Sequence, residues 1–388
     1  MSPKPSSHWR TRLIHTEADV SRHFTSLAPA TYRGSTVLFD RIADAVDDWR
    51  EAAGYTYGLY GTPTTRELAA RVAELEGAAH TFVVPGGQAA LALVYFACCR
   101  AGDHALLPES AYGPNRELAE GLLRGLGIDV EPYDPLLGAA IDTLIRPNTT
   151  LVWCESPGSI TMEVQDVPAI AAAAHRHGAR VALDNTYAAG VMFDAFAAGV
   201  DVTLQALTKY IGGHSDLLLG TVSVRDEAGY ERVGSAHNLL GMAVSPDDCT
   251  LALRGLQTLG VRLDRLEQST LAVARWLASQ PAIALVLHPA LPDCPGHDIW
   301  KRDFTGSTSV FSIVFDERWT RERIERFVDG LRLFKIGYSW GGVTSLAMMY
   351  PALPRAVRHY DGRIVRLNIG LEETDDLIAD LGAALRQA

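Results

Sequence analysis

From residue 64 onward, short apolar runs alternate with longer segments whose apolar residues recur at helical spacing. Arg66–Glu76 and Val167–His177 are such helical segments. Strands that alternate with helices predict a mostly parallel sheet with helices on both faces. Ligands bind such sheets beyond the carboxyl ends of the strands. The apolar runs predict strands at Thr81–Val84, Ala105–Leu107, Leu151–Glu155, Val181–Asp184, Val202–Gln205 and Thr221–Val224.

A different pattern begins at Ser245-Pro246-Asp247-Asp248. The serine can cap a helix, the proline fits the first turn, and the two acids favour the helix dipole. A long helix is expected from there to about Ser279. The remainder indicates a smaller α+β domain, with strands at Ser309–Phe315, Leu333–Tyr338 and Ile364–Ile369 and helices at Arg321–Gly330 and Asp375–Arg386.

The beginning of the chain is polar, aromatic and loop-like. This composition is typical of an arm that packs on another subunit. We therefore predict three parts: an N-terminal arm over residues 1–60, a large domain over 61–250, and a small domain over 251–388 that includes the long helix.

Composition narrows the possible partners. The chain has 388 residues and a formal net charge of −11 at pH 7, which argues against nucleic acid or an anionic membrane as a partner. We expect a cytoplasmic protein, because the N-terminus lacks a signal-peptide core and the cysteines form no disulfide framework. Neither the cysteines nor the histidines have metal-site spacing, so no metal is expected. The cysteines are Cys98, Cys99, Cys154, Cys249 and Cys294.

An acid and a lysine follow two neighbouring strands of the pattern. Asp184 ends one predicted strand, and Lys209 lies just after the next. A lysine in this place can hold pyridoxal phosphate (PLP) as a Schiff base, and an acid can keep the ring nitrogen of PLP protonated. Most lysines are simply solvated, and a strand-end aspartate often caps a turn. The spacing of the two residues favours the cofactor.

A phosphate site is expected at Pro85-Gly86-Gly87-Gln88, which follows a strand and opens an Ala-rich helix. Backbone amides at a helix N-terminus bind phosphate. Thr208 would add a hydroxyl. The sequence lacks a GxGxxG fingerprint, so a dinucleotide is not expected, and the segment by itself also fits an ordinary strand-to-helix turn.

Two further side chains are candidates for cofactor and substrate contacts. Tyr112 follows a strand end, where its ring could stack on a pyridine ring or be an ordinary partly buried aromatic. Arg366 lies in an apolar strand and needs an anionic partner there. That partner would be either the carboxylate of an amino acid, bound bidentately, or an acidic side chain of the protein itself.

Taken together, these residues resemble the Cys/Met-metabolism family of PLP enzymes. The segment Asp201–Asp216, which contains Lys209, matches the signature of the family around its lysine. Other segments are similar to the bacterial cystathionine β-lyase branch. They are Glu155–Glu163 (ESPGSITME), Tyr338–Gly342 (YSWGG), His288–Pro292 (HPALP) and Trp300–Gly306 (WKRDFTG). The resemblance extends from about Thr11 to the end of the chain.

The resemblance implies an aminotransferase-like fold of type I and a role for each candidate. Lys209 and Tyr112 would be catalytic, the latter stacking on PLP, and Asp184 would pair with the ring nitrogen. Tyr57 would reach the cofactor phosphate of a neighbouring subunit, which implies a homodimer, usually doubled to a homotetramer with shared active sites. The implied phosphate ligands are Gly87, Gln88 and Thr208, and the implied substrate contacts are Arg366, Ser339 and Trp340.

The activity implied is carbon–sulfur β-elimination from a thioether amino acid. L-Cystathionine would give homocysteine, pyruvate and ammonia, as in transsulfuration and methionine biosynthesis. Two alternatives stay open: a lyase or desulfhydrase acting on cysteine, cystine or an S-conjugate, and a PLP-binding regulatory protein without turnover.

One residue departs from the pattern of the family. Its arm motif is tyrosine, any residue, arginine, and the arginine binds phosphate across the subunit interface. Here the motif is Tyr57-Gly58-Leu59, so leucine replaces the arginine. A charge-assisted contact worth about 1.5–3 kcal/mol is therefore missing. We expect weaker PLP binding than in relatives that have the arginine.

Overall fold

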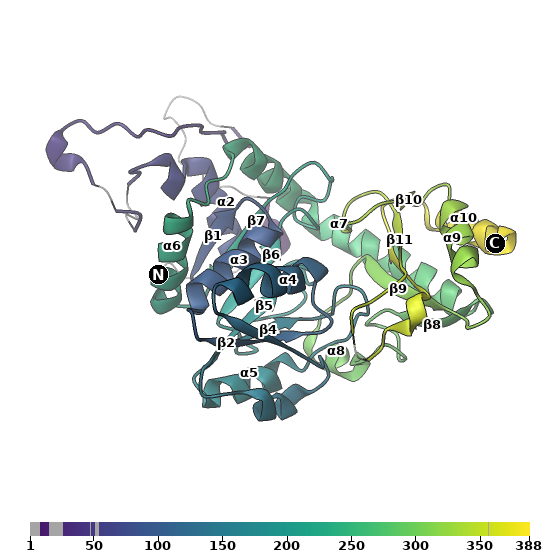
Figure 1. Cartoon of the computed structure of the whole chain (residues 1–388). Coiled ribbons are helices and arrows are strands. Elements are labelled where there is room, and N and C mark those ends of the chain that lie inside the picture. Colours follow the sequence, from purple (N-terminus) through teal and green to yellow (C-terminus); the bar gives the residue numbers. More distant parts are fainter. Residues whose placement is uncertain (1–7, 15–25, 47, 51–53, 356) are drawn as a thin grey trace. The chain divides into compact units, whose positions relative to one another are not determined.

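A computed structural model of the chain (Figure 1) describes residues 8–14, 26–46, 48–50, 54–355 and 357–388. By their contacts, the residues group into two compact units. The first unit combines residues 1–98 with 201–260, and the second combines residues 99–200 with 261–388. Each unit therefore contains segments that lie far apart in the sequence. The predicted division into an arm, a large domain and a small domain stays a prediction.

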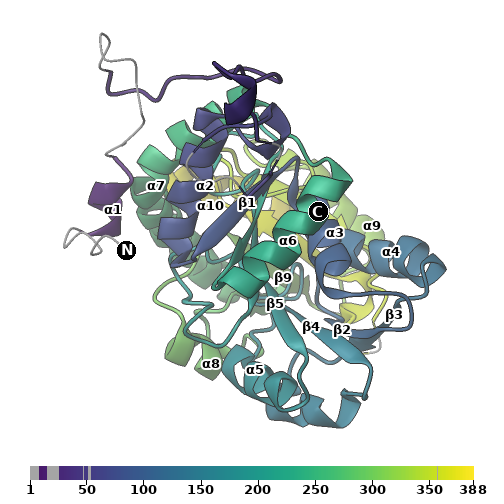
Figure 2. The same ribbon diagram turned by 90° about the vertical axis from the view of Figure 1, so that its left-hand side faces the viewer.

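The sheet of the first unit is antiparallel. Strand β7 (Gly220–Val224) lies between β1 (His80–Val84) and β6 (Val202–Ala206) and runs antiparallel to both. Helix α2 packs on the face from which Thr203 and Ser223 point, and α3 and α6 pack on the other face (Figure 2). These helices are α2 (Pro63–Glu76), α3 (Gly87–Cys98) and α6 (Glu227–Leu240).

Local sequence explains where α2 begins and ends. The Thr62 hydroxyl accepts a hydrogen bond from the backbone N–H of Thr65, and Pro63 takes the first helical position. Gly77 ends the helix in the left-handed conformation, with φ +72°. The helix predicted from Arg66 is confirmed, and it starts one turn earlier because Thr62 supplies the cap.

The second unit contains a parallel sheet. Its strand order is β5 (Arg180–Asp184), β4 (Thr149–Glu155), β2 (His104–Pro108) and β3 (Asp129–Tyr133), and neighbouring strands are parallel. Helix α5 (Val167–Arg176) packs against β4 and β5. Because the strands are parallel, their carboxyl ends meet at one edge, where Glu155 pairs in register with Asp184.

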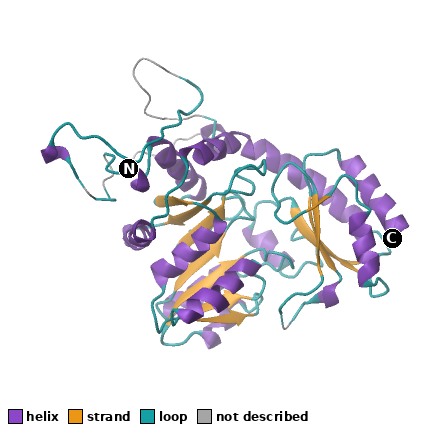
Figure 3. Cartoon of the chain, turned by 45° about the horizontal axis from the view of Figure 1, so that its top comes forward, coloured by secondary structure: helices purple, strands orange, loops and turns teal. Residues whose placement is uncertain are grey.

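The same unit has a smaller, mostly antiparallel sheet (Figure 3). Helices α9 and α10 cover one face of it and share its core, which includes Phe311, Phe315, Phe327, Val365 and Leu377. The last turns of the long helix α7 (Pro246–Ala278) contribute to this core through Val273 and Leu277. In order across the sheet, the strands are β10 (Lys335–Ile336), β11 (Leu346–Tyr350), β12 (Ile364–Asn368), β9 (Val310–Phe315) and β8 (Ile283–Leu287), and the helices are α9 (Arg321–Asp329) and α10 (Thr374–Gln387).

Short helical segments complete the described part of the chain. The α-helical ones are α1 (Trp9–Arg12), α4 (Gly113–Leu118) and α8 (His297–Asp303), the 3-10 turns are Ile42–Asp44, Gly58–Tyr60, Gly138–Leu144 and Tyr360–Gly362, and a π-helix spans Ala119–Leu123. None of the helices in the described ranges is long and apolar enough to cross a membrane. All five cysteines are buried, and none of them is in a disulfide.

Most predicted elements are confirmed, with ends that shift by a few residues. The elements that were not predicted include the strands β3, β8 and β11, the helix α6 and the short helices α1, α4 and α8. Strand β3 contains Pro132 and polar residues, which suit only an edge strand, and β11 is rich in Ala and Met, which have weak strand preference. The strand predicted over Leu333–Tyr338 is correct only for Lys335–Ile336.

Glu76 ties α2 to the sheet of the first unit and provides a test of this packing. Its buried carboxylate accepts hydrogen bonds from Thr203 Oγ1 (3.0 Å), Gln205 Nε2 (3.1 Å) and Ser223 Oγ (2.8 Å). Glu76→Ala would leave the buried donors of Thr203 and Gln205 without this acceptor, so we expect it to lower the free energy of unfolding by about 3 kcal/mol. The Ser223 hydroxyl could still bond to the Thr81 hydroxyl. Urea unfolding measures the change. Exposed Glu74 on the same helix is the control, and Glu74→Ala should cost less than about 1 kcal/mol. Equal losses in the two variants would contradict the prediction.

Candidate active site

Two glycines let α3 begin directly against the end of β6 in the first unit. A Cβ added to Gly87 would lie 2.9 Å from the Cβ of Ala206, and one added to Gly220 would lie 2.6 Å from the carbonyl oxygen of Gly86. No other residue fits either position without a shift of its surroundings. The first N–H groups of α3, including those of Gly87 and Gln88, have no acceptor within the helix and can receive an anion.

Lys209 lies in a tight turn that follows β6. Its N–H donates to the carbonyl of Ala206 (3.0 Å), and its own carbonyl accepts from the N–H of Gly213 (2.7 Å). The lysine is half-buried. The hydroxyl of Thr208 donates to the carbonyl of Leu219 and accepts from its N–H, both at 3.3 Å. A phosphate at Thr208 would therefore compete with the Leu219 carbonyl for the hydroxyl proton.

Two carboxylates end adjacent strands in the second unit. Asp184 Oδ1 accepts from the N–H of Thr186 (3.0 Å), so the aspartate does cap the turn that follows β5. Glu155 is 7% exposed and accepts from the N–H of Tyr112 (2.7 Å). Burial, and then the negative charge of Asp184, raise the pKa of Glu155 well above its usual value. Glu155 was not among the predicted site residues. Its position at a strand end, in line with Asp184, was the available signal.

Tyr112 and Arg366 share this region of the second unit. Tyr112 begins α4 and is 41% exposed. Burial raises the pKa of its hydroxyl, although the positive charge of Arg366 lowers it. Arg366 is 6% exposed on β12, donates from Nη1 to the carbonyl of Ser159 (3.2 Å) and lies over the ring of Tyr350 (5.3 Å to the centroid). A buried guanidinium over an aromatic ring is well suited to bind a carboxylate.

Ser339 and Trp340 lie in the loop between β10 and β11. Ser339 has φ +90°, a backbone conformation that costs free energy for a residue with a side chain. The next turn is fixed because the Gly341 N–H donates to Oδ1 of Asn368 (2.8 Å), and Asn368 lies on β12 together with Arg366. This hydrogen bond links the Ser339–Trp340 loop to the strand that carries the arginine.

The arm residues lie in the first unit. Tyr57 is 48% exposed and pairs with Thr36 in an isolated bridge. Leu59 follows in the 3-10 turn and lines a cavity of about 280 Å³ together with Trp49, Phe82 and Tyr230.

The structure thus divides the predicted residues between the two units. Gly87, Gln88, Thr208, Lys209 and Tyr57 belong to the first unit. In the second unit, the charges of Asp184, Glu155 and Arg366 all act on Tyr112, so these four residues are close neighbours. Among the described residues, no group of three or more His, Cys, Asp and Glu side chains is arranged to hold a metal ion.

Comparison with known proteins identifies the family. The model of the Cys/Met metabolism PLP-dependent enzymes matches residues 10–386. The chain belongs to this family. It is 46% identical to a putative cystathionine beta-lyase of Rhizobium johnstonii, over 96% of this chain and 94% of that protein. It is 43% identical to the cystathionine beta-lyase MetC of Escherichia coli, over 90% of this chain and 91% of that one.

Solved structures confirm the fold. The crystal structure of metB from Corynebacterium glutamicum is 29% identical and superposes with a TM-score of 0.91, covering 98% of both chains. With the parallel sheet and the smaller antiparallel sheet, this likeness confirms the type I, aminotransferase-like class that was expected. Membership of the family also confirms PLP as the cofactor.

The residues described above fit PLP. The glycines at the start of α3 leave room for an anion at its N–H groups, which suits a phosphate. Lys209, next to the end of β6, offers an amine. The second unit offers an aromatic ring at Tyr112 and an acid at Asp184 for a protonated ring nitrogen.

The raised pKa of Glu155 predicts how pH affects stability without cofactor. The folded protein keeps a proton on Glu155 that the unfolded chain releases above about pH 4.3. The free energy of unfolding is therefore unaffected by Glu155 at low pH, where both states carry the proton. It falls as pH rises toward the raised pKa, because only the unfolded chain releases the proton. Glutamine cannot ionise, and it still offers an oxygen to the Tyr112 N–H. Relative to the native protein, Glu155→Gln should become more stable as pH rises from about 5 to about 8.

Thermal unfolding of the cofactor-free proteins across this range measures the effect. Exposed Glu120 is the matched control, because Glu120→Gln makes the same substitution at a side chain that is 60% exposed. A Glu155→Gln difference that shrinks with rising pH would show that Glu155 is ionised in the folded protein.

Proposed function

We propose that the protein is a PLP-dependent carbon–sulfur β-lyase that cleaves L-cystathionine to homocysteine, pyruvate and ammonia. The main support is the match over at least nine-tenths of the chain to relatives named cystathionine beta-lyase. The buried Arg366 beside Tyr112 and Asp184 supports an amino-acid substrate, because it provides a cation for an α-carboxylate.

We propose that Lys209 binds PLP covalently and that Asp184 keeps the ring nitrogen protonated. The N–H groups of Gly87 and Gln88, with the Thr208 hydroxyl, would bind the phosphate. Tyr112 would stack on the ring. In the proposed assembly, Tyr57 reaches the phosphate of a neighbouring subunit, so the active form is a homodimer or a homotetramer, and we propose that it acts in the cytoplasm.

In the proposed reaction, Arg366 binds the substrate α-carboxylate, and Ser339 and Trp340 line the same region. The substrate amine would take the place of the Lys209 amine on the cofactor, and the freed amine of Lys209 would then remove the Cα proton. PLP supplies the electron sink for the pair left on Cα. The Cβ–S bond then breaks, the sulfur leaves as the thiol of homocysteine, and water converts the remaining three-carbon fragment to pyruvate and ammonia. Lys209 would return its proton during these steps.

Leu59 is the observation that favours the alternatives. A lyase acting on cysteine, cystine or an S-conjugate would use the same proton transfer with a smaller or different leaving group. A regulatory PLP-binding protein would keep the cofactor contacts without turnover. The retention of Lys209, Asp184, Tyr112 and Arg366 supports a catalytic protein.

Pyruvate release from the PLP-loaded protein tests the proposal, with L-cystathionine and L-cysteine assayed side by side. We expect faster release from cystathionine, with homocysteine as the thiol product. Lys209→Ala should lose turnover by at least about 10²-fold, because it lacks the base that moves the Cα proton, and should retain PLP only non-covalently. Removal of its PLP by gel filtration, with absorbance as the readout, checks the second part. Faster turnover of cysteine would favour the first alternative, and no turnover of either amino acid the second. Retained activity in Lys209→Ala would refute the assigned role of the lysine.

Leu59→Arg tests the missing phosphate contact. If an arginine at this position reaches the phosphate, its charge should tighten PLP binding by about tenfold or more. The dissociation constant of PLP, titrated by fluorescence into the cofactor-free protein, is the measurement. Leu59→Met is the matched control, because it lengthens the side chain without adding charge. An unchanged constant in Leu59→Arg would mean that the surroundings no longer direct this position toward the phosphate.

A further inference from the structure

The direction of Arg366 depends on a loop that follows β4. Arg366 Nη1 donates to the carbonyl of Ser159 (3.2 Å), which lies in the segment 156–163. The Ser159 N–H donates to the carbonyl of Ser110 (2.9 Å), and the next carbonyl, of Ile160, accepts from the Ser312 hydroxyl (2.6 Å). Ser312 pairs in register with Arg366 across β9 and β12. A shift of this loop would therefore redirect the guanidinium.

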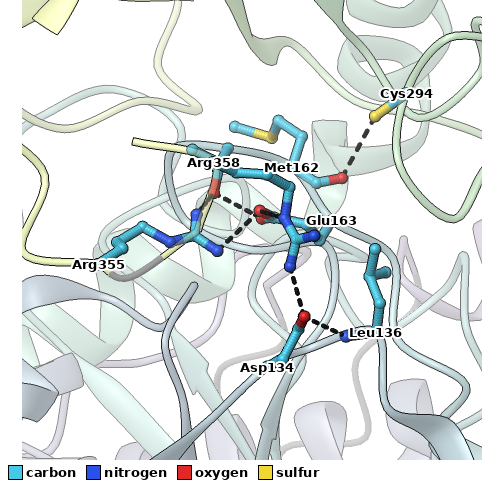
Figure 4. A network of polar contacts seen from close by, with 8 residues as sticks. Asp134, Leu136, Met162, Glu163, Cys294, Arg355 and Arg358 are labelled. Carbon is cyan, nitrogen blue, oxygen red and sulfur yellow. Dashed lines mark hydrogen bonds and ion pairs between the residues drawn. The ribbon is translucent and has the colours of Figure 1, made fainter. Parts of the chain in front are cut away.

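The loop ends at a buried carboxylate bound by two arginines (Figure 4). The side chain of Glu163 has no exposed surface, and its Oε1 lies 2.8 Å from Nη2 of Arg355 and 3.0 Å from Nε of Arg358. Its Oε2 accepts from the hydroxyl of Thr161 (2.5 Å), and Arg355 also donates to that hydroxyl. Asp134 forms an ion pair with Arg358, so two acids balance two arginines.

Close packing transmits the position of Glu163 to Ser159. The N–H of Gly158 donates to the carbonyl of Glu163 (3.0 Å). A Cβ added to Gly158 would lie 2.5 Å from the Cβ of Ser110 and 3.2 Å from Oε2 of Glu163. Gly158 is therefore confined between these two side chains, and Ser159 is the next residue along the chain.

Both arginines come from the segment between β11 and β12. Arg355 is 3% exposed and Arg358 is 19% exposed. Arg358 itself has φ +54°, an unfavourable conformation for a residue with a side chain. Ionic contacts with Glu163 and Asp134 offset this cost.

We propose that Glu163, bound by Arg355 and Arg358, is a positioning residue that fixes the Ser159 carbonyl and so directs Arg366 toward the substrate carboxylate. This inference rests on the carboxylate-binding role of Arg366 in the proposed function. Glu163 itself would contact neither the substrate nor the cofactor.

Glu163→Gln tests the proposal, since it keeps the shape of the side chain and removes its charge. The PLP-loaded protein should bind L-alanine, an amino acid without a leaving group, about tenfold more weakly, as measured by the change in cofactor absorbance. The KM for L-cystathionine should rise to a similar extent while kcat changes by less than about twofold. Arg358→Lys keeps a positive charge and should show a smaller loss of the same kind. It carries the test if Glu163→Gln does not fold.

A double-mutant cycle separates positioning from general loss of structure. In an Arg366→Ala background, Glu163→Gln should weaken L-alanine binding by less than about twofold, because the arginine through which it acts is gone. Exposed Glu325 on α9 gives the matched control, and Glu325→Gln should leave L-alanine binding unchanged. Independent, multiplicative effects of Glu163→Gln and Arg366→Ala would overturn the positioning role. If Arg366→Ala alone leaves binding unchanged, the role of Arg366 in the proposed function fails instead.

Discussion

Two acids at adjacent strand ends, buried Glu155 and half-buried Asp184, constrain the second unit. Parallel pairing places Glu155 beside Asp184, and a low-dielectric environment does not favour two negative charges at that distance. The repulsion is reduced in three ways. The pKa of Glu155 is raised, its carboxylate accepts a hydrogen bond from the N–H of Tyr112, and the positive charge of Arg366 acts on it. The start of α4 and the centre of β12 are thus tied to the same edge of the sheet. The carboxyl group of Asp184 at this edge, beside the hydrogen-bonded Glu155, suits the binding of a cationic ring nitrogen.

In the first unit, the main constraint is the close packing that leaves the backbone N–H groups at the start of α3 available to an anion. Glycines at the start of α3 and at the start of β7 allow the helix to approach the end of β6, just before Lys209. On the opposite face, Glu76 satisfies three buried donors of β6 and β7. The strands that present the lysine are therefore fixed from both faces, which favours a well-defined position for the amine.

The two arginines that bind Glu163 fix a loop in the second unit, next to the proposed carboxylate-binding residue Arg366. The hydrogen bond from Arg366 to the Ser159 carbonyl holds the guanidinium only as firmly as the loop 156–163 holds that carbonyl. Glu163, Arg355, Arg358 and Asp134 form a charge-balanced and largely buried network beneath that loop. Loss of one partner would leave another charge buried without compensation, so the network resists gradual displacement.

The sequence by itself determined the family, the cofactor and most of the helices and strands. It could do so because apolar periodicity, helix caps and the lysine signature are local patterns. It did not reveal β3 or β11, whose residues have weak strand preference and are stabilised by pairing with distant strands. The pairing of Glu155 with Asp184 required the register of two strands. Glu163 with Arg355 and Arg358 required contacts across nearly 200 positions of the chain. Only the tertiary structure decided these, because burial and charge pairing depend on which segments meet in space.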